Sequence, residues 1–183
     1  MANRTGTYFA FDGLGQADPT KSDFRYYATV QSWTANKSME FNFVNSHDKA
    51  AAVRDTSKLE TLKTSIRVRL AASNRMVIIL SPATRKTGSL LSYEIEKAVD
   101  RYDLPLIVAY TGRDYVLSPL SLSSRWPAVL TARINNETAK AIHIPFRQTA
   151  ILKAIKSYSV NGQQPSGPQR IYTREVQEKW GYL

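Results

Sequence analysis

The chain has 183 residues, of which 43% are hydrophobic, and this length suits one globular core better than two. It contains no cysteine and two histidines, which excludes disulfides, thiolate catalysis and cysteine-ligated metal sites. Lysine and arginine number 25 against 15 acidic residues, and the net charge of +10 predicts an anionic partner such as nucleic acid, a nucleotide or a membrane surface. No run approaches the roughly 18 apolar residues of a membrane span and no signal peptide is evident, so we expect a cytoplasmic protein.

Short apolar runs alternate with helical patterns along most of the chain. Residues 39–44 alternate apolar with polar, which predicts an edge strand, whereas the continuous apolar run 76–80 predicts a central strand covered on both faces. A capping box at Ser57 precedes a stripe of leucine and isoleucine at helical spacing. In chain order the predicted elements are strand 7–11, loop 13–22, helix 23–36, strand 39–44, helix 57–72, strand 76–80, helix 89–102, strand 104–110, strand 141–145 and helix 148–158.

The last third of the chain contains two stretches without a clear period. Residues 112–140 carry two prolines, Pro119 and Pro127, and because proline interrupts regular elements we expect this segment to be irregular. After residue 159 a linker rich in glycine, glutamine and proline leads to an aromatic tail. We therefore divide the chain into a domain at 1–159 and a linker with C-terminal tail at 160–183. The tail has enough aromatic surface to dock, either on its own domain or on another subunit.

Repeated strand–helix units joined by short connections predict a parallel sheet, because parallel neighbours need a crossover between them. The simplest arrangement of five such strands is a flavodoxin-like, doubly wound α/β fold with helices on both faces. Ligands of these folds bind at the carboxyl ends of the strands, where the strand order reverses. This rule selects residues after strands 7–11 and 76–80 and at the start of helix 23–36. The binding candidates are Phe11, Asp12, Phe24, Ser81, Thr84 and Arg85.

Each of these candidates also has a purely structural interpretation. The two phenylalanines suit core packing, Asp12 and Ser81 suit turns, and Arg85 suits a solvated surface or a contact with pyrophosphate. Gly13 and Gly15 follow a strand, but the third glycine of a dinucleotide fingerprint is missing. The chain also lacks a Walker lysine motif and a nucleophile elbow, so the standard NTPase and hydrolase machinery is excluded.

Two carboxylates lie on the predicted helix 89–102. At about 100° per residue, Glu94 falls on the margin of the apolar stripe, whereas Glu96 points further toward solvent. Glu94 is therefore the better candidate for a carboxylate that reaches a cleft. The alternative is a solvated glutamate favoured by the helix dipole.

Three segments together resemble the TIR-like domain of the Thoeris antiphage defence system. They are YFAFD at 8–12, VIILSP at 77–82, and LSYEIEKA at 91–98 leading into LPLIV at 104–108. The resemblance covers roughly residues 7–158, is strongest around Tyr93, Glu94 and Ile95, and implies the same flavodoxin-like fold. The chain departs from many relatives at Leu91, where they carry a tryptophan.

The resemblance implies an enzyme that cleaves NAD⁺ at the nicotinamide glycosidic bond. Its product would be a cyclic ADP-ribose isomer, a second messenger for a separate effector, with Glu94 as the catalytic carboxylate. NAD⁺ would be the substrate, with no further cofactor and no metal. A single acid suffices chemically, because nicotinamide leaves NAD⁺ as a neutral molecule and needs no proton. We expect the loop 13–22 to act as a lid that excludes water during cyclisation.

Three alternatives remain at the level of sequence. The enzyme could join ADP-ribose to another molecule, or the domain could be a non-catalytic interaction module. Nucleic-acid binding is a weaker alternative, because the basic residues of helix 57–72 are spread around its circumference. Self-assembly and a phage-derived trigger are the partners expected beside NAD⁺ and the effector, and we expect no membrane partner.

Overall fold

The computed structural model describes residues 4–16, 18–35, 43–44 and 56–183. Most of the predicted strand 39–44 therefore lies outside the described residues. The elements in chain order are β1 (Gly6–Phe11), the 3₁₀ helix η1 (Pro19–Lys21), α1 (Phe24–Ala35), β2 (Phe43–Val44), α2 (Thr56–Ala72), β3 (Ser73–Leu80), α3 (Leu90–Asp100), β4 (Leu106–Tyr110), the 3₁₀ helix η3 (Pro119–Arg125), α4 (Ala128–Asn135), β5 (Ala141–Pro145), α5 (Gln148–Ser157), β6 (Arg170–Ile171) and α6 (Arg174–Lys179).

The strands form one parallel sheet in the order β2-β1-β3-β4-β5-β6. The first five strands have the flavodoxin-like order predicted from the sequence, with β2 at the edge and β3 inside the sheet. The order reverses between β1 and β3, so the crevice predicted for a ligand lies at the carboxyl ends of these two strands. β6 is an addition that the sequence analysis did not include.

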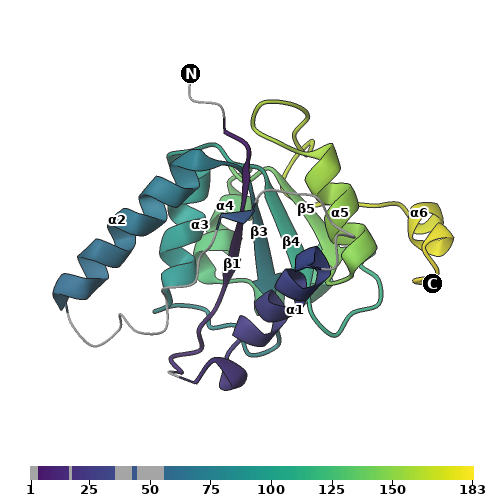
Figure 1. The fold of residues 1–183 in the computed structure, drawn as a ribbon. Helices are drawn as coiled ribbons and strands as arrows, with labels where there is room; N and C mark the ends of the chain where they lie inside the picture. The colour runs from purple at the N-terminus through teal and green to yellow at the C-terminus, as the bar shows by residue number, and fades with distance from the viewer. Residues whose placement is uncertain (1–3, 17, 36–42, 45–55) are drawn as a thin grey trace.

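Helices cover both faces of the sheet, as Figure 1 shows. On one face, the strand residues at alternate positions, such as Tyr8, Ile78 and Val108, pack against α2, α3 and α4. On the other face, the intervening residues, such as Phe9 and Ile79, pack against α1 and α5. Both faces of β3 are covered, which explains why its residues 76–80 are apolar without interruption.

The prediction that residues 112–140 are irregular is wrong. This segment contains η3, which begins at Pro119, and α4, which follows Pro127. Proline lacks an N–H, but the first turn of a helix has no partner for that N–H, so both prolines start helices here. Leu130 and Ile134 of α4 are buried against the α2 and α3 face of the sheet.

The C-terminal tail packs on its own domain, which answers the question left open above. β6 pairs with β5, with Ile171 beside His143. In α6 the side chain of Gln177 is buried, and its amide both donates to and accepts from the backbone of Val116, at 2.9 and 3.0 Å. The position of the domain limit at residue 159 stays a prediction.

None of the helices in the described part of the chain is long and apolar enough to cross a bilayer.

A buried chain of hydrogen bonds joins β4, β5 and the linker after α5. The indole N–H of Trp126 donates to the Tyr110 hydroxyl at 2.6 Å, and that hydroxyl lies 2.7 Å from Nδ1 of His143. Nε2 of His143 lies 2.9 Å from the carbonyl oxygen of Pro168. Because a carbonyl only accepts, the proton of a neutral imidazole sits on Nε2 and Nδ1 accepts from Tyr110.

Burial lowers the pKa of His143 to about 4, although the bond to Pro168 opposes this shift. In the unfolded chain histidine takes up its proton near pH 6.5, so between pH 6.5 and 4 the unfolded state binds more protons. The stability contributed by the neutral ring is complete above pH 6.5 and is lost as the pH falls toward 4. We expect this loss to be about 3 kcal/mol.

The variant His143→Gln, which does not titrate, isolates this effect. Urea unfolding of both proteins from pH 7.5 to 4 should show the advantage of the wild type shrinking by about 3 kcal/mol below pH 6.5. Parallel stability curves over this range would contradict a neutral buried His143.

Candidate active site

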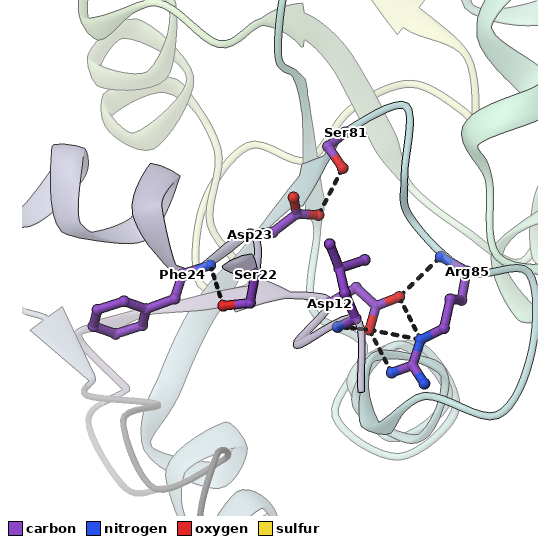
Figure 2. A network of polar contacts seen from close by, with 7 residues as sticks. Asp12, Ser22, Asp23, Phe24, Ser81 and Arg85 are labelled. Atoms are coloured by element: carbon purple, nitrogen blue, oxygen red, sulfur yellow. Dashed lines mark hydrogen bonds and ion pairs between the residues drawn. The ribbon is translucent and has the colours of Figure 1, made fainter. Parts of the chain in front are cut away.

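Five polar residues meet at the carboxyl ends of β1 and β3, where the strand order reverses. Figure 2 shows Asp12, Asp23, Ser81 and Arg85 of this group. Four of the five are site residues predicted from the sequence: Asp12, Ser81, Thr84 and Arg85. The fifth, Asp23, stands just before α1. The folding of two βα units side by side thus brings together loops that are about 60 to 70 residues apart in the sequence.

Asp12 and Arg85 form a bidentate ion pair. The guanidinium donates to Oδ1 at 2.6 Å and to Oδ2 at 3.0 Å, and the backbone N–H of Arg85 donates to Oδ2 at 2.8 Å. The backbone N–H of Leu14 adds a bond to Oδ1 at 2.9 Å. Burial alone would raise the pKa of Asp12, but the bonds from Arg85 and Leu14 outweigh it and hold the pKa below its usual range. Asp12 is therefore ionised at neutral pH and ties the start of loop 13–22 to the loop after β3.

Asp23 faces Ser81 across the crevice. The Ser81 hydroxyl donates to Oδ2 of Asp23 at 2.8 Å, and the nearby Thr84 hydroxyl also acts on this buried carboxyl group. The Thr84 hydroxyl accepts from the backbone N–H of Ser81 at 2.9 Å and so closes the turn after β3. Burial raises the pKa of Asp23 to about 6; the Ser81 bond opposes the shift and the charge of Asp12 adds to it. This carboxyl group can exchange a proton near neutral pH, unlike Asp12.

Phe11 and Phe24 belong to an aromatic cluster beneath the crevice. Phe11 ends β1 and stacks on Tyr27 with ring centroids 5.4 Å apart, and the Phe24 ring meets Phe11 edge-on at 5.9 Å. Phe11 is buried, and Phe24 is half-buried at the start of α1. The core-packing interpretation of both rings therefore holds, and their contact with a substrate stays a prediction.

Glu94 lies in the second turn of α3 and has no exposed surface. The hydroxyl of Tyr8, which is also fully buried, donates to Oε1 of Glu94. Glu96 remains 42% exposed and pairs with Lys97 at 2.6 Å. The wheel argument that Glu94 points inward and Glu96 outward is confirmed, although Glu94 is buried more deeply than a marginal position suggests.

Three cationic side chains surround Tyr93, the residue that precedes Glu94. The guanidinium of Arg67 donates to the Tyr93 hydroxyl at 2.9 Å, and the ammonium groups of Lys63 and Lys97 lie 5.6 and 5.3 Å from the centre of the Tyr93 ring. Part of the net charge of +10 is thus gathered where α2 meets α3. Lys86, which follows Arg85 in the sequence, does not belong to this group and donates to the backbone carbonyls of Ser123 and Trp126.

A hollow of about 390 Å³ lies in the segment that follows β4. Residues between Gly112 and Leu122 line it, and none of the predicted site residues is among them. The hollow therefore does not belong to the crevice between β1 and β3.

Sequence reasoning missed two residues of the site, Tyr8 and Asp23. Ser22 and Asp23 are both residue types that cap helices, and here Ser22 takes the capping bond by accepting from the backbone N–H of Phe24 at 3.2 Å. That leaves the Asp23 carboxylate to turn toward Ser81. Tyr8 was read as one aromatic residue of a strand. The signal that could have identified it is the alternation of a strand, since Tyr8 and Ala10 lie on the same face of β1 and α3 covers that face.

Part of the chain matches a model of a known protein family. The model described as "Thoeris protein ThsB, TIR-like domain" matches residues 8–114, which include all the predicted site residues. No curated protein matches the chain.

Proposed function

The chain belongs to the family of TIR-like domains of the Thoeris antiphage defence protein ThsB, and we propose that it cleaves NAD⁺ at the nicotinamide glycosidic bond. The product in this proposal is a cyclic ADP-ribose isomer that signals to a separate effector. Glu94 is the catalytic carboxylate, and the crevice between β1 and β3 binds the rest of the dinucleotide.

The observation that carries the proposal is the burial of the Glu94 carboxylate in an apolar core cluster. An ionised carboxyl group is costly to bury, and a leucine or methionine would fill the same space without that cost. Carboxylates kept in such positions are typical of functional sites. In the family to which this chain belongs, the chemistry that needs only one carboxylate is the departure of a neutral leaving group.

The reaction needs one negative charge at the right place. When the bond between C1 of the ribose and the nicotinamide nitrogen breaks, both bonding electrons go to the nitrogen, and the ribose becomes positively charged. The Glu94 carboxylate stabilises this charge, and a low-dielectric surrounding strengthens the interaction. A hydroxyl group of the same molecule then attacks C1 and loses its proton to the Glu94 carboxylate, which gives the cyclic product, provided that water is excluded.

The crevice offers groups suited to the remainder of NAD⁺. The Arg85 side chain is 38% exposed while it pairs with Asp12, and we propose that its outer edge contacts the pyrophosphate. Asp12, Ser81 and Thr84 hold the loops that carry it. Phe11 and Phe24 form the apolar floor.

The enclosed position of Glu94 bears on regulation. Since the side chain has no accessible surface here, NAD⁺ can reach it only when the segments that cover it move. Self-assembly or a phage-derived trigger is the proposed cause of that opening.

The test is to incubate the purified protein with NAD⁺ over a wide range of protein concentrations, with and without lysate from infected cells. We expect release of nicotinamide together with a product lighter than ADP-ribose by one water, which mass spectrometry identifies as cyclic. A product heavier than ADP-ribose would identify the variant that joins ADP-ribose to another molecule. Absence of nicotinamide under all these conditions would contradict the proposal and favour a non-catalytic interaction module.

A further inference from the structure

A hydrogen bond between Tyr8 and Glu94 joins β1 to α3 across 86 positions of sequence, and both side chains are fully buried. We propose that Tyr8 is a positioning residue, whose hydroxyl holds the Glu94 carboxylate in the orientation that meets the nicotinamide ribose. This inference rests on the proposed function and adds to it a residue from a different element.

The direction of the bond is determined by the two groups. Burial raises the pKa of the Tyr8 hydroxyl well above its ordinary value, and the negative charge of Glu94 raises it further. Tyr8 therefore keeps its proton at neutral pH and donates it to the carboxylate. Hydrogen bonds to an ionised acceptor are roughly twice as strong as those between neutral groups.

Packing alone gives no reason for this pair. Tyr8 belongs to a core cluster that contains the apolar side chains of Ile66, Leu70 and Met76, and the charge of Arg69 also acts on its hydroxyl. Phenylalanine and leucine would fill the two positions, and replacing both partners of a buried polar pair by apolar groups is often neutral or stabilising. The pair is explained if the carboxylate is needed and the hydroxyl serves it.

The location of Tyr8 suits a positioning role. β1 lies inside the sheet between β2 and β3, so its backbone is held on both sides. A donor on a strand of this kind moves less than a donor on a loop. Because a misplacement of about 1 Å can cost about 100-fold in rate, a fixed carboxylate has a direct kinetic value.

The test is the variant Tyr8→Phe, which removes only the hydroxyl. We expect kcat for nicotinamide release to fall about 10- to 100-fold, with a much smaller change in KM. The acid limb of the pH–rate profile should move to higher pH, because the ionised form of Glu94 loses a donor. Incorporation of 3-fluorotyrosine at position 8 preserves the shape and makes the hydroxyl a stronger donor, so it should move the same limb to lower pH.

The matched control is Tyr110→Phe. Tyr110 is equally buried in the same cluster and its hydroxyl also forms hydrogen bonds, but to Trp126 and His143. We expect a loss of thermal stability comparable to that of Tyr8→Phe, with kcat and the pH profile close to those of the wild type.

The outcomes separate the inference from the proposed function. A wild type that releases nicotinamide, with Tyr8→Phe and fluorotyrosine variants that keep its kcat and pH profile, overturns the role of Tyr8 alone. Equal losses of kcat in Tyr8→Phe and Tyr110→Phe would also overturn it, since both would then reflect general destabilisation. A wild type that releases no nicotinamide overturns the proposed function and this inference with it.

Discussion

Replacing Glu94 with glutamine is expected to reduce nicotinamide release from NAD⁺ at least about 100-fold, which corresponds to about 2.7 kcal/mol of transition-state stabilisation. Glutamine has nearly the same shape and can still accept a hydrogen bond from Tyr8. It carries no negative charge, however, and so it cannot balance the charge that develops on the ribose. Nicotinamide release measured under single-turnover conditions, with NAD⁺ binding measured separately, distinguishes a loss of chemistry from a loss of affinity.

The control for this prediction is Glu96→Gln, two residues further along α3. Glu96 is partly exposed and pairs with Lys97, so its charge is screened by solvent. We expect this variant to retain the wild-type rate and the wild-type melting temperature. If Glu94→Gln kept more than about a tenth of the wild-type rate, the catalytic assignment would be wrong.

The second large effect is on stability. Asp23→Asn is expected to stabilise the folded protein at pH 7.5 by about 2–3 kcal/mol, or about 5–10 °C in melting temperature. The wild-type carboxyl group has a pKa of about 6 in the folded protein and near 3.8 when unperturbed. Its contribution to stability is therefore complete below pH 3.8 and is lost as the pH rises through 6. Above pH 6 the folded state must hold a buried negative charge that the amide avoids.

Denaturant unfolding of both proteins between pH 4 and 8 measures this effect. The two curves should meet near pH 4 and separate as the pH rises to about 6.5. Asp18→Asn, in the exposed part of loop 13–22, is the control and should follow the wild type. If Asp23→Asn were less stable than the wild type at every pH, Asp23 would be a favourable carboxylate, and our account of its burial would be incorrect.

Asp23 and His143 act in opposite directions over nearly the same pH range. As the pH falls from 6 to 4, protonation of Asp23 adds stability, whereas the neutral His143 ring loses its advantage. The stability of the wild type over this range is thus expected to be flatter than either group alone would make it. Each contribution becomes visible only in the comparison with its own variant.

The cost of burying Asp23 is typical of a functional site, where charged groups are kept although they destabilise the fold. Asp23 lies beside Asp12, which avoids this cost by pairing with Arg85. The pKa values of the two aspartates of the crevice therefore differ for a structural reason: Asp12 forms a direct ion pair with Arg85, whereas the charge of Arg25 only partly offsets the burial of Asp23.

Most of the secondary structure was predictable because its signals are local. The continuous apolar run of β3 and the leucine stripe of α2 each depend on residues within one element. The bounds of α2 were predicted to within one residue, whereas β3 begins at Ser73, three residues before the predicted strand 76–80. The segment 112–140 was not predictable in the same way. Proline occurs both in breaks between elements and at helix starts, and the local sequence does not distinguish the two. Similarly, β6 has two residues, which is too short for any periodic pattern.

The sequence by itself determined the α/β class, the order of the first five strands and the candidate site residues at the strand ends. The alternation of strands and helices and the polar residues that follow strands can be recognised along the chain, and the handedness of crossovers is a general rule. Only the tertiary structure decided that Tyr8 bonds Glu94, that Ser81 bonds Asp23, and that the tail packs on its own domain. These contacts join positions 86 and 58 residues apart, and they depend on which strands the crossovers bring side by side. The pKa of Asp23 and the burial of Glu94 follow from such contacts, because burial is a property of the packed chain and no local pattern contains it.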